Sequence, residues 1–357
     1  MTLRTLASTT AILAAGASTA YAGALDRGKL PISPIFEKGT YVEVGTAIIV
    51  PSVDGTTAGG ANISNIYENY TQTQLSFKTD ITDNLAVAVS FFQPAGTDIT
   101  YATDPFLGPL SGTTANLDTN AISAIVKYRF DNNISVYGGA KYETITADLT
   151  LGPAPPNAFS FARDYDLAPI AGIAYEKPDI ALRVSFTYIG KTEYLLNTTL
   201  AGVGTLPSSA TGVPESFTLN FQTGIAKDTL LFGEIRHSKW SDVDVIVPAI
   251  GAPVGPNLSN FDDITSFDLG VGRKLTDAVS VFTSLNYERR IDGVTGNLAP
   301  IDGRYALSVG GSYTKGKAKF TGGVRYTRLG DVTTTTFGNS FEGNSSLSFG
   351  FKVGYSF

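Results

Sequence analysis

The chain has 357 residues, of which 43% are hydrophobic and only 16% charged, and its formal net charge is −6. This acidic balance and the absence of a long basic run argue against nucleic-acid binding, which needs clustered Lys and Arg. The chain has no cysteine and one histidine. Thiolate metal sites and His-dependent catalytic triads therefore lack their parts, and we predict no enzymatic activity, no metal and no cofactor.

The first residues have the pattern of a cleaved export signal. Arg4 is followed by an apolar stretch over residues 6–17, and Ala20-Tyr21-Ala22 has small residues at both positions that a signal peptidase reads. We predict a signal peptide over residues 1–22; the alternative is a buried N-terminal helix. No later stretch approaches the ~20 apolar residues of a spanning helix, so an exported, membrane-bound chain must span as strands.

From about residue 40 onward the sequence repeats a segment that alternates apolar and polar residues, followed by a turn. Short and long connections alternate along the chain. The short turns lie at 79–84, 131–133, 177–179, 227–229, 276–278 and 315–317, and the long loops at 51–67, 94–118, 148–163, 192–214, 241–261, 292–302 and 331–343. This rhythm predicts an all-β fold: an antiparallel transmembrane β-barrel of about 14 strands over 40–357, with long outer loops and short periplasmic turns.

The last segment shows the alternation clearly. Leu347, Phe349 and Phe351 alternate with Ser348, Gly350 and Lys352. Successive side chains of a strand point to opposite faces, so one face is apolar and the other is polar or small. A soluble β-sandwich would also alternate, but the aromatic ends of the apolar faces favour a bacterial outer-membrane barrel.

Phe357 ends the chain on this last strand. A terminal aromatic residue in such a strand resembles the signal read by the barrel-assembly machinery, which we expect to be a partner along with outer-membrane lipids. The alternative is an ordinary final strand without a recognition role.

Several segments resemble the FadL/TodX family of outer-membrane transporters of long-chain fatty acids and aromatic hydrocarbons. They are Leu25-Asp26-Arg27, residues 32–36, Tyr41-Val42-Glu43, residues 51–55, residues 92–101, residues 232–236 and residues 239–242. The resemblance implies a 14-stranded, monomeric barrel that passes hydrophobic small molecules without an energy source. Family members carry a longer N-terminal hatch with an Asn-Pro-Ala motif. Here only residues 23–39 precede the barrel, which implies a shortened plug or periplasmic segment.

Apolar residues in the expected loops and at one strand end are candidates for ligand binding. Exposed apolar clusters are costly unless they contact something, and ligand pockets are mostly apolar. The alternative is that these side chains pack together and close the barrel mouth. The candidates are Phe92, Phe106, Leu107, Leu110, Leu195, Leu196, Leu200, Val203, Ile246 and Ile250.

Charged residues on the expected lumen face form a second group of candidates, namely Lys127, Arg129, Arg183, Glu234, Arg236 and Arg325. Pairing is the usual way to bury charge, so we expect a structural network; Arg236 or Lys127 could instead anchor a carboxylate. Pro94 cannot donate a ladder hydrogen bond. It marks either a break that opens a lateral exit or a plain strand end.

These observations favour passive outer-membrane transport of long-chain fatty acids or other hydrophobic small molecules. Two alternatives remain from the sequence: a general small-solute porin with a wide aqueous lumen, and a structural or adhesive barrel whose loops bind partners.

Overall fold

The computed structural model describes residues 25–155, 157–251, 254–259, 261–291 and 295–357. The predicted signal peptide, residues 1–22, lies outside the described residues. Within the described ranges, no helix has both the length and the apolar character needed to cross a membrane.

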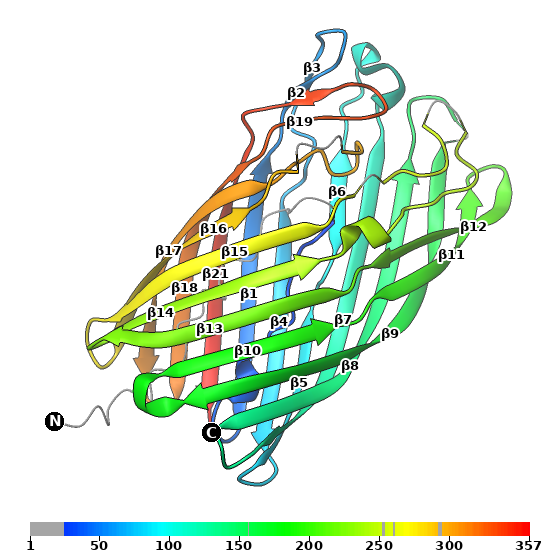
Figure 1. The fold of residues 1–357 in the computed structure, drawn as a ribbon. Coiled ribbons are helices and arrows are strands. Elements are labelled where there is room, and N and C mark those ends of the chain that lie inside the picture. The colour runs from blue at the N-terminus through cyan, green and yellow to red at the C-terminus, as the bar shows by residue number, and fades with distance from the viewer. Residues whose placement is uncertain (1–24, 156, 252–253, 260, 292–294) are drawn as a thin grey trace.

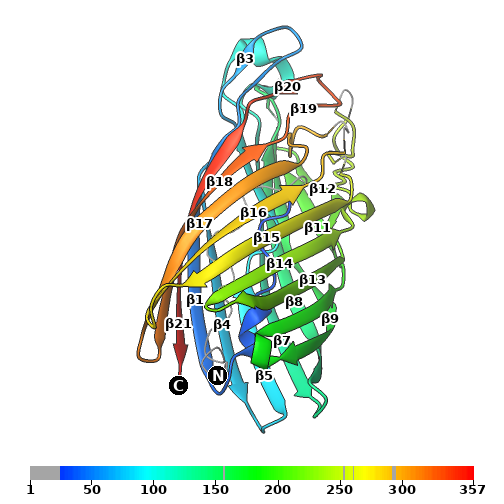
Figure 2. The same ribbon diagram turned by 60° about the vertical axis from the view of Figure 1, so that its left-hand side comes forward.

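The described chain forms a closed antiparallel β-barrel (Figures 1 and 2). Seventeen strand segments make fourteen wall strands, because the third, seventh and eighth are each interrupted. In chain order they are β1 (Tyr41–Ser52), β4 (Tyr70–Asp80), β5 (Leu85–Phe92) with β6 (Gly96–Thr100), β7 (Thr114–Arg129), β8 (Ile134–Thr150), β9 (Ala158–Lys177), β10 (Leu182–Ile189) with β11 (Thr192–Leu200), β12 (Gly204–Val213) with β13 (Ser216–Ala226), β14 (Thr229–Ser238), β15 (Ile264–Lys274), β16 (Val279–Glu288), β17 (Arg304–Lys315), β18 (Ala318–Leu329) and β21 (Ser345–Ser356).

The first and last wall strands pair with each other along their whole length, from Tyr41 opposite Ser356 to Ser52 opposite Ser345. This pairing closes the wall and satisfies the backbone groups that an open sheet would leave at its edges. The predicted antiparallel barrel of fourteen strands is therefore confirmed.

Short turns gather at one end of the barrel and long loops at the other (Figures 1 and 2). At the loop end a small sheet forms from β2 (Gly55–Thr56), β3 (Asn62–Ile63), β19 (Val332–Thr333) and β20 (Ser340–Phe341). The remaining short elements are the 3-10 helices η2 (Ser33–Phe36), η3 (Pro105–Leu110), η4 (Pro178–Ile180) and η5 (Trp240–Asp242).

One expected loop is wrong. Residues 192–214 form β11 and β12, which extend the seventh and eighth wall strands as a hairpin. Thr192, Tyr194 and Leu196 are buried while Glu193 and Leu195 are exposed, so this segment keeps the strand period. Its Gly, Ser and Thr content is typical of a loop, but pairing across the hairpin decides the structure. The expected loop at 94–118 likewise contains β6 and the start of β7.

The outside of the wall is apolar. On β21, Leu347, Phe349 and Phe351 are exposed, whereas the alternate residues Ser348 and Lys352 are buried in the interior. Tyr355 of β21 and aromatic residues in or next to other wall strands are exposed in the same way, namely Tyr128, Phe130, Tyr175, Tyr287, Tyr305, Tyr313 and Tyr326. A continuous apolar belt of this kind is stable against lipid and costly in water, so the barrel is a transmembrane one.

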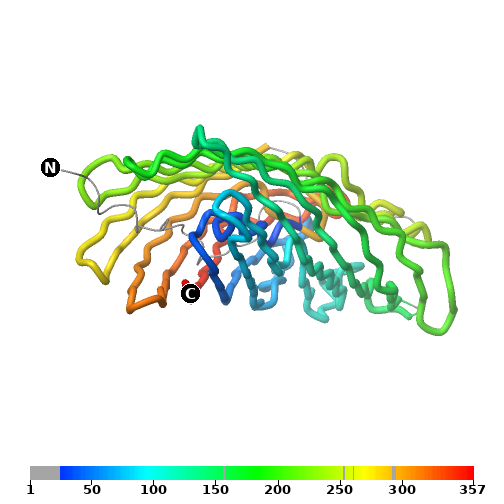
Figure 3. Tube along the Cα trace, turned by 90° about the horizontal axis from the view of Figure 1, so that it is seen from below, coloured from blue at the N-terminus to red at the C-terminus, as the bar shows by residue number. Residues whose placement is uncertain are grey.

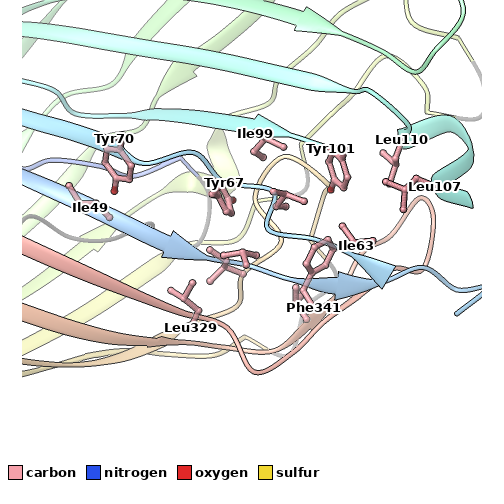
Figure 4. Close-up of a cluster of buried hydrophobic side chains, with 14 of the residues drawn as sticks. Ile49, Ile63, Tyr67, Tyr70, Ile99, Tyr101, Leu107, Leu110, Leu329 and Phe341 are labelled. Atoms are coloured by element: carbon pink, nitrogen blue, oxygen red, sulfur yellow. The ribbon is translucent and has the colours of Figure 1, made fainter. Parts of the chain in front are cut away.

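Buried side chains from several loops pack together at the outer end (Figure 4). Tyr101 precedes η3 and Leu110 is its last residue. Both pack against Ile63 of β3 and Phe341 of β20 in this cluster. Each of these side chains is almost fully buried. The loops therefore cover the mouth of the barrel with an apolar core of their own.

Candidate functional site

Residues 25–39, here called the N-terminal segment, lie inside the barrel wall (Figure 3). Leu30 and Ile35 pack against wall residues that include Phe92 and Ile125. Leu25, further along the lumen, joins a separate cluster of buried side chains around the loop after β14. Burial of these apolar side chains holds the segment against the inner face, as expected from the hydrophobic effect.

Ion pairs and a cation–π contact fix the same segment to three wall strands. Asp26 pairs with Arg236 of β14, and Lys29 pairs with Glu234 of the same strand. Arg27 Nη1 donates to Asp118 Oδ1 of β7 at 2.7 Å. Its guanidinium also lies over the ring of Tyr70 on β4, 4.6 Å from the centroid. These contacts tie one short stretch of chain to widely separated parts of the wall.

The third wall strand is interrupted where the N-terminal segment contacts it.

 Residues 93–95 separate β5 from β6 and face only residues 119–120 of β7, so the third strand carries one extra residue, a β-bulge. Pro94 has no N–H group to donate to a ladder. The N–H of Ala95 donates to Thr119 Oγ1 at 2.8 Å, a side-chain bond in place of a ladder bond.

The N-terminal segment takes up the backbone groups that the bulge frees. The Pro94 carbonyl accepts the N–H groups of Arg27 at 2.9 Å and Gly28 at 3.1 Å, and the N–H of Gly96 donates to the Leu25 carbonyl at 2.8 Å. A Cβ at Gly28 would lie 2.4 Å from the Gln93 carbonyl oxygen, so only glycine allows this close approach. The segment and the bulge are thus paired with each other by main-chain hydrogen bonds.

The wall lacks a backbone ladder between β4 and the bulge. The pairing of β4 with β5 ends at Leu75, which lies opposite Phe91. Further along, the two wall strands pair again only at an isolated bridge between Tyr67 and Ile99 of β6. Both pairs belong to one register, in which residues 69–74 face residues 92–97. We call this unpaired stretch the β4 gap.

Side chains bridge the β4 gap where backbone bonds are missing. Gln93 Oε1 accepts the N–H of Thr73 at 3.0 Å. Gln72 is the residue opposite Pro94 in the register of the two strands. The side chain of Gln72 is only 7% exposed, and it lines a cavity on the inner side of the gap.

The interior formed by the described residues includes four cavities. The central cavity, of about 180 Å³, lies between the N-terminal segment and residues of β1, β4, β14, β15 and β18. A side cavity of about 50 Å³ shares part of its lining, including Leu30 and Phe92. Nearer the loops, an apolar cavity of about 50 Å³ contains Leu196 and Ile246, and an outer cavity of about 260 Å³ lies beneath the loops.

The structure brings some candidate ligand-binding residues to these cavities. Phe92 lines the central and side cavities, Leu196 and Ile246 line the apolar cavity, and Leu110 lines the outer cavity. The last two cavities share part of their lining, including Leu149 and Leu298. These residues therefore follow the interior from the loops towards the bulge.

Other candidates lie elsewhere. Leu107, Leu200 and Ile250 pack in the apolar clusters of the loop end. The side chains of Phe106, Leu195 and Val203 are 80%, 66% and 59% exposed and line none of the four cavities. Leu195 faces outward because β11 is a strand whose alternate residues point away from the lumen.

Most lumen candidates are engaged with other groups. Arg325 pairs with Asp268 at 3.7 Å, and its Nε donates to Ser308 Oγ at 2.8 Å. Glu234 and Arg236 hold the N-terminal segment, as described above. These contacts agree with a structural network of paired charges.

Lys127 and Arg183 lie on the ring of Phe36, with Lys127 Nζ 4.8 Å and Arg183 Cζ 4.5 Å from its centroid. Both contacts are of cation–π type. Arg129 lies on the lumen side of β7, opposite the buried Ser135, but its side chain is not enclosed by the barrel. It is the last residue of β7, it is exposed, and it donates to the Asp83 carbonyl at the short-turn end, where the strand no longer encloses its side chain.

A second stretch without a backbone ladder lies between β9 and β11, over residues 162–168 of β9. There the side chains of two aspartates act as acceptors. Asp166 Oδ2 accepts the N–H of Glu193, and Asp164 Oδ2 accepts the N–H of Leu195, each at 2.9 Å. Carboxylates thus replace carbonyl groups as hydrogen-bond acceptors along this seam.

Sequence reasoning missed the residues around the bulge other than Pro94 and Phe92. Gln72 and Gln93 are ordinary polar residues in an alternating strand, and Asp26 lies in a segment without periodicity. The Gln-Pro pair at 93–94 was the available signal, because a proline in a strand marks a bulge, an edge or an end. Which side chains and which segment fill the break depends on contacts far apart in sequence.

No known family profile matches the sequence, and no curated protein matches it in sequence. Solved structures do match in fold. A Pseudomonas aeruginosa FadL homologue has 13% identity and a TM-score of 0.70, covering 91% of this chain and 92% of its own. The toluene transporter TodX of P. putida has 15% identity and a TM-score of 0.65, with 92% of each chain covered.

The toluene transporter TbuX of Ralstonia pickettii matches with 14% identity and a TM-score of 0.65, covering 94% of this chain and 96% of its own. These matches extend over nearly the whole length of each protein. The chain therefore has the fold of the FadL and TodX barrels.

Proposed function

We propose that this barrel is a passive channel that carries hydrophobic small molecules across the bacterial outer membrane. The observation that carries the proposal is the β4 gap, an unpaired stretch of wall beside the central cavity. The fold shared with proteins described as a FadL homologue and as toluene transporters supports the same class of cargo. Long-chain fatty acids and monoaromatic compounds are both in this class.

The cavities suggest the order of events. A hydrophobic molecule enters under the loops into the outer cavity, then reaches the apolar cavity, whose lining is shared in part with the first. Pockets of mainly apolar character suit such a cargo. Beyond them the N-terminal segment separates the molecule from the central cavity and from the β4 gap.

In this proposal residues 23–39 act as a short plug, and Pro94 marks the lateral exit. The plug closes the exit because its backbone bonds to the bulge carbonyl of Pro94 and to the N–H of Gly96. Movement of the plug would free both the lumen and the bulge. Transport then runs down the concentration gradient into the membrane, where the apolar cargo is more stable than in water.

The proposal also includes the biogenesis expected from the sequence. Residues 1–22 direct export and are removed, and residues 40–357 assemble as a monomeric barrel. Phe357 is the feature that the assembly machinery would read. Its backbone N–H donates to the Thr40 carbonyl at 2.9 Å, and its side chain stays 66% exposed beside Tyr355.

Cross-linking across the gap tests the exit. The chain has no cysteine, so Thr73→Cys with Gln93→Cys gives two unique thiols on opposite sides of the β4 gap. The matched control is Thr79→Cys with Val87→Cys, a pair on the same strands where the ladder is intact. Uptake of a labelled hydrophobic compound is measured in cells before and after treatment with a bis-maleimide.

We expect cross-linking of the gap pair to reduce uptake and cross-linking of the control pair to leave it unchanged. Equal uptake before and after linking the gap would show that the cargo leaves elsewhere. Uptake of hydrophilic sugars, with no uptake of hydrophobic compounds, would instead identify a general porin. A barrel that passes neither class would contradict transport as a whole.

A further inference from the structure

The charged groups that line the central cavity are balanced. Its lining includes the cations Arg27, Lys29 and Arg325 and the carboxylates Glu43, Glu234 and Asp268. Each cation has a carboxylate partner: Asp118, Glu234 and Asp268 in turn. Glu43 pairs with Lys352 of β21 at 2.9 Å.

A ligand carboxylate in this cavity would therefore have to compete with an existing partner for a cation. A buried charge without a partner is costly, and breaking a buried pair to supply one is costly as well. The cavity as built disfavours a charged head group.

The amide of Gln72 is different from those of the two other glutamines that line the cavity. Its Nε2 and its Oε1 are both buried, and neither has a hydrogen-bond partner among the described residues. By contrast, the neighbouring Gln74 donates to Glu43 Oε1 at 3.4 Å, and Gln93 accepts from Thr73. Gln72 therefore offers one donor group and one acceptor at the inner side of the β4 gap, opposite Pro94.

A buried donor or acceptor without a partner loses its hydration and gains nothing in return. A molecule that both donates and accepts a hydrogen bond would satisfy the two ends of the Gln72 amide at once. A plain hydrocarbon would leave both unsatisfied, and a carboxylate could only accept. The amide therefore distinguishes three classes of hydrophobic cargo.

We propose that the cargo is an amphipathic molecule with an uncharged head group that both donates and accepts a hydrogen bond, such as a primary amide or an alcohol on an alkyl chain, and that Gln72 binds this head group beside the gap. The inference rests on the proposed function, because it places the head group in the same interior path. It selects one class among the hydrophobic compounds.

A head-group series tests the inference on the purified full-length mature barrel in detergent. The probes are four compounds of one chain length: a primary amide, an alcohol, a carboxylate at pH 8 and an alkane. Their affinities are compared by competition with a fluorescent hydrophobic probe. We expect the amide and the alcohol to bind more tightly than the carboxylate and the alkane.

Gln72→Leu keeps the volume of the side chain and removes both hydrogen-bonding groups. We expect it to weaken binding of the amide roughly 30-fold, the combined effect of two neutral hydrogen bonds, and to leave the alkane unchanged. Thr71→Val, the adjacent residue on the exposed face of β4, is the matched control and should change neither. Heat-dependent migration in gels shows whether each variant is folded.

A carboxylate that binds wild-type protein as tightly as the amide would overturn the inference, and this comparison needs no variant. The inference would also be overturned if folded Gln72→Leu still bound the amide and the alcohol more tightly than the carboxylate and the alkane. The Gln72 amide would then not bind the head group, and water would be its hydrogen-bond partner. If all four compounds bind equally, the proposed transport of hydrophobic molecules stands and the head-group inference fails. If none binds, both fail.

Discussion

Replacing Arg27 with alanine should release the N-terminal segment from the wall. The substitution removes the hydrogen-bonded ion pair with Asp118 and the contact with the ring of Tyr70. Asp118 is 39% exposed, so we take the ion pair at about 1 kcal/mol, the upper range for pairs reached by solvent. The cation–π contact adds about 1 kcal/mol.

The sum of about 2 kcal/mol corresponds to roughly a 30-fold rise in the population of the released segment. Ser33 lies in the segment and lines the central cavity, so Ser33→Cys supplies a single thiol that reports its release. The rate of maleimide labelling is measured in liposomes. We expect labelling to be roughly 30-fold faster with Arg27→Ala than without it, if brief release limits the reaction.

Lys38→Ala is the control, because Lys38 is an exposed cation of the same segment. It should leave the labelling rate of Ser33→Cys close to its original value. Equal rates in the Arg27→Ala and Lys38→Ala proteins would refute the reasoning. They would mean that packing of Leu30 and Ile35, and not the ion pair, holds the segment in place.

Three further predictions concern the wall. Lys141→Met should cost about 3–5 kcal/mol of unfolding free energy in a bilayer, because it leaves Glu143 buried without its partner, and adding Glu143→Leu should recover most of the loss. Asp166→Ala should speed hydrogen exchange of the Glu193 amide, which loses its acceptor; exchange at the original rate would show that this bond does not limit opening of the seam. Leu285→Arg places a charge on the outer face of the wall. If residue 285 lies near the bilayer midplane, the substitution should destabilise the barrel by about 2–4 kcal/mol in lipid. A cost near zero would show that residue 285 lies at the membrane interface.

The number of wall strands and their inner and outer faces could be predicted because a strand carries its information locally. The side-chain period of two makes Phe349 and Ser348 face opposite sides wherever the strand lies. The same rule held in β11, although the composition of residues 192–214 led to the expectation of a loop. Periodicity was a better guide there than Gly, Ser and Thr content.

Composition could not decide which apolar loop residues face a cavity. Leu107 and Leu110 belong to one short helix with Phe106, yet the first two are buried in the loop core and Phe106 is exposed. The outcome depends on the loops that cover the helix, which come from distant parts of the chain. Apolar character alone therefore predicts burial only on average.

The amino-acid sequence by itself determined the barrel and its lipid-facing belt, since both depend on a pattern that each strand carries within one short stretch. Only the tertiary structure decided what happens at Pro94. The proline removes one N–H donor from the ladder, but the groups that donate to its carbonyl, the N–H groups of Arg27 and Gly28, come from a different part of the chain. Backbone groups are satisfied by whatever the closed fold brings within reach, and that is a property of the whole barrel.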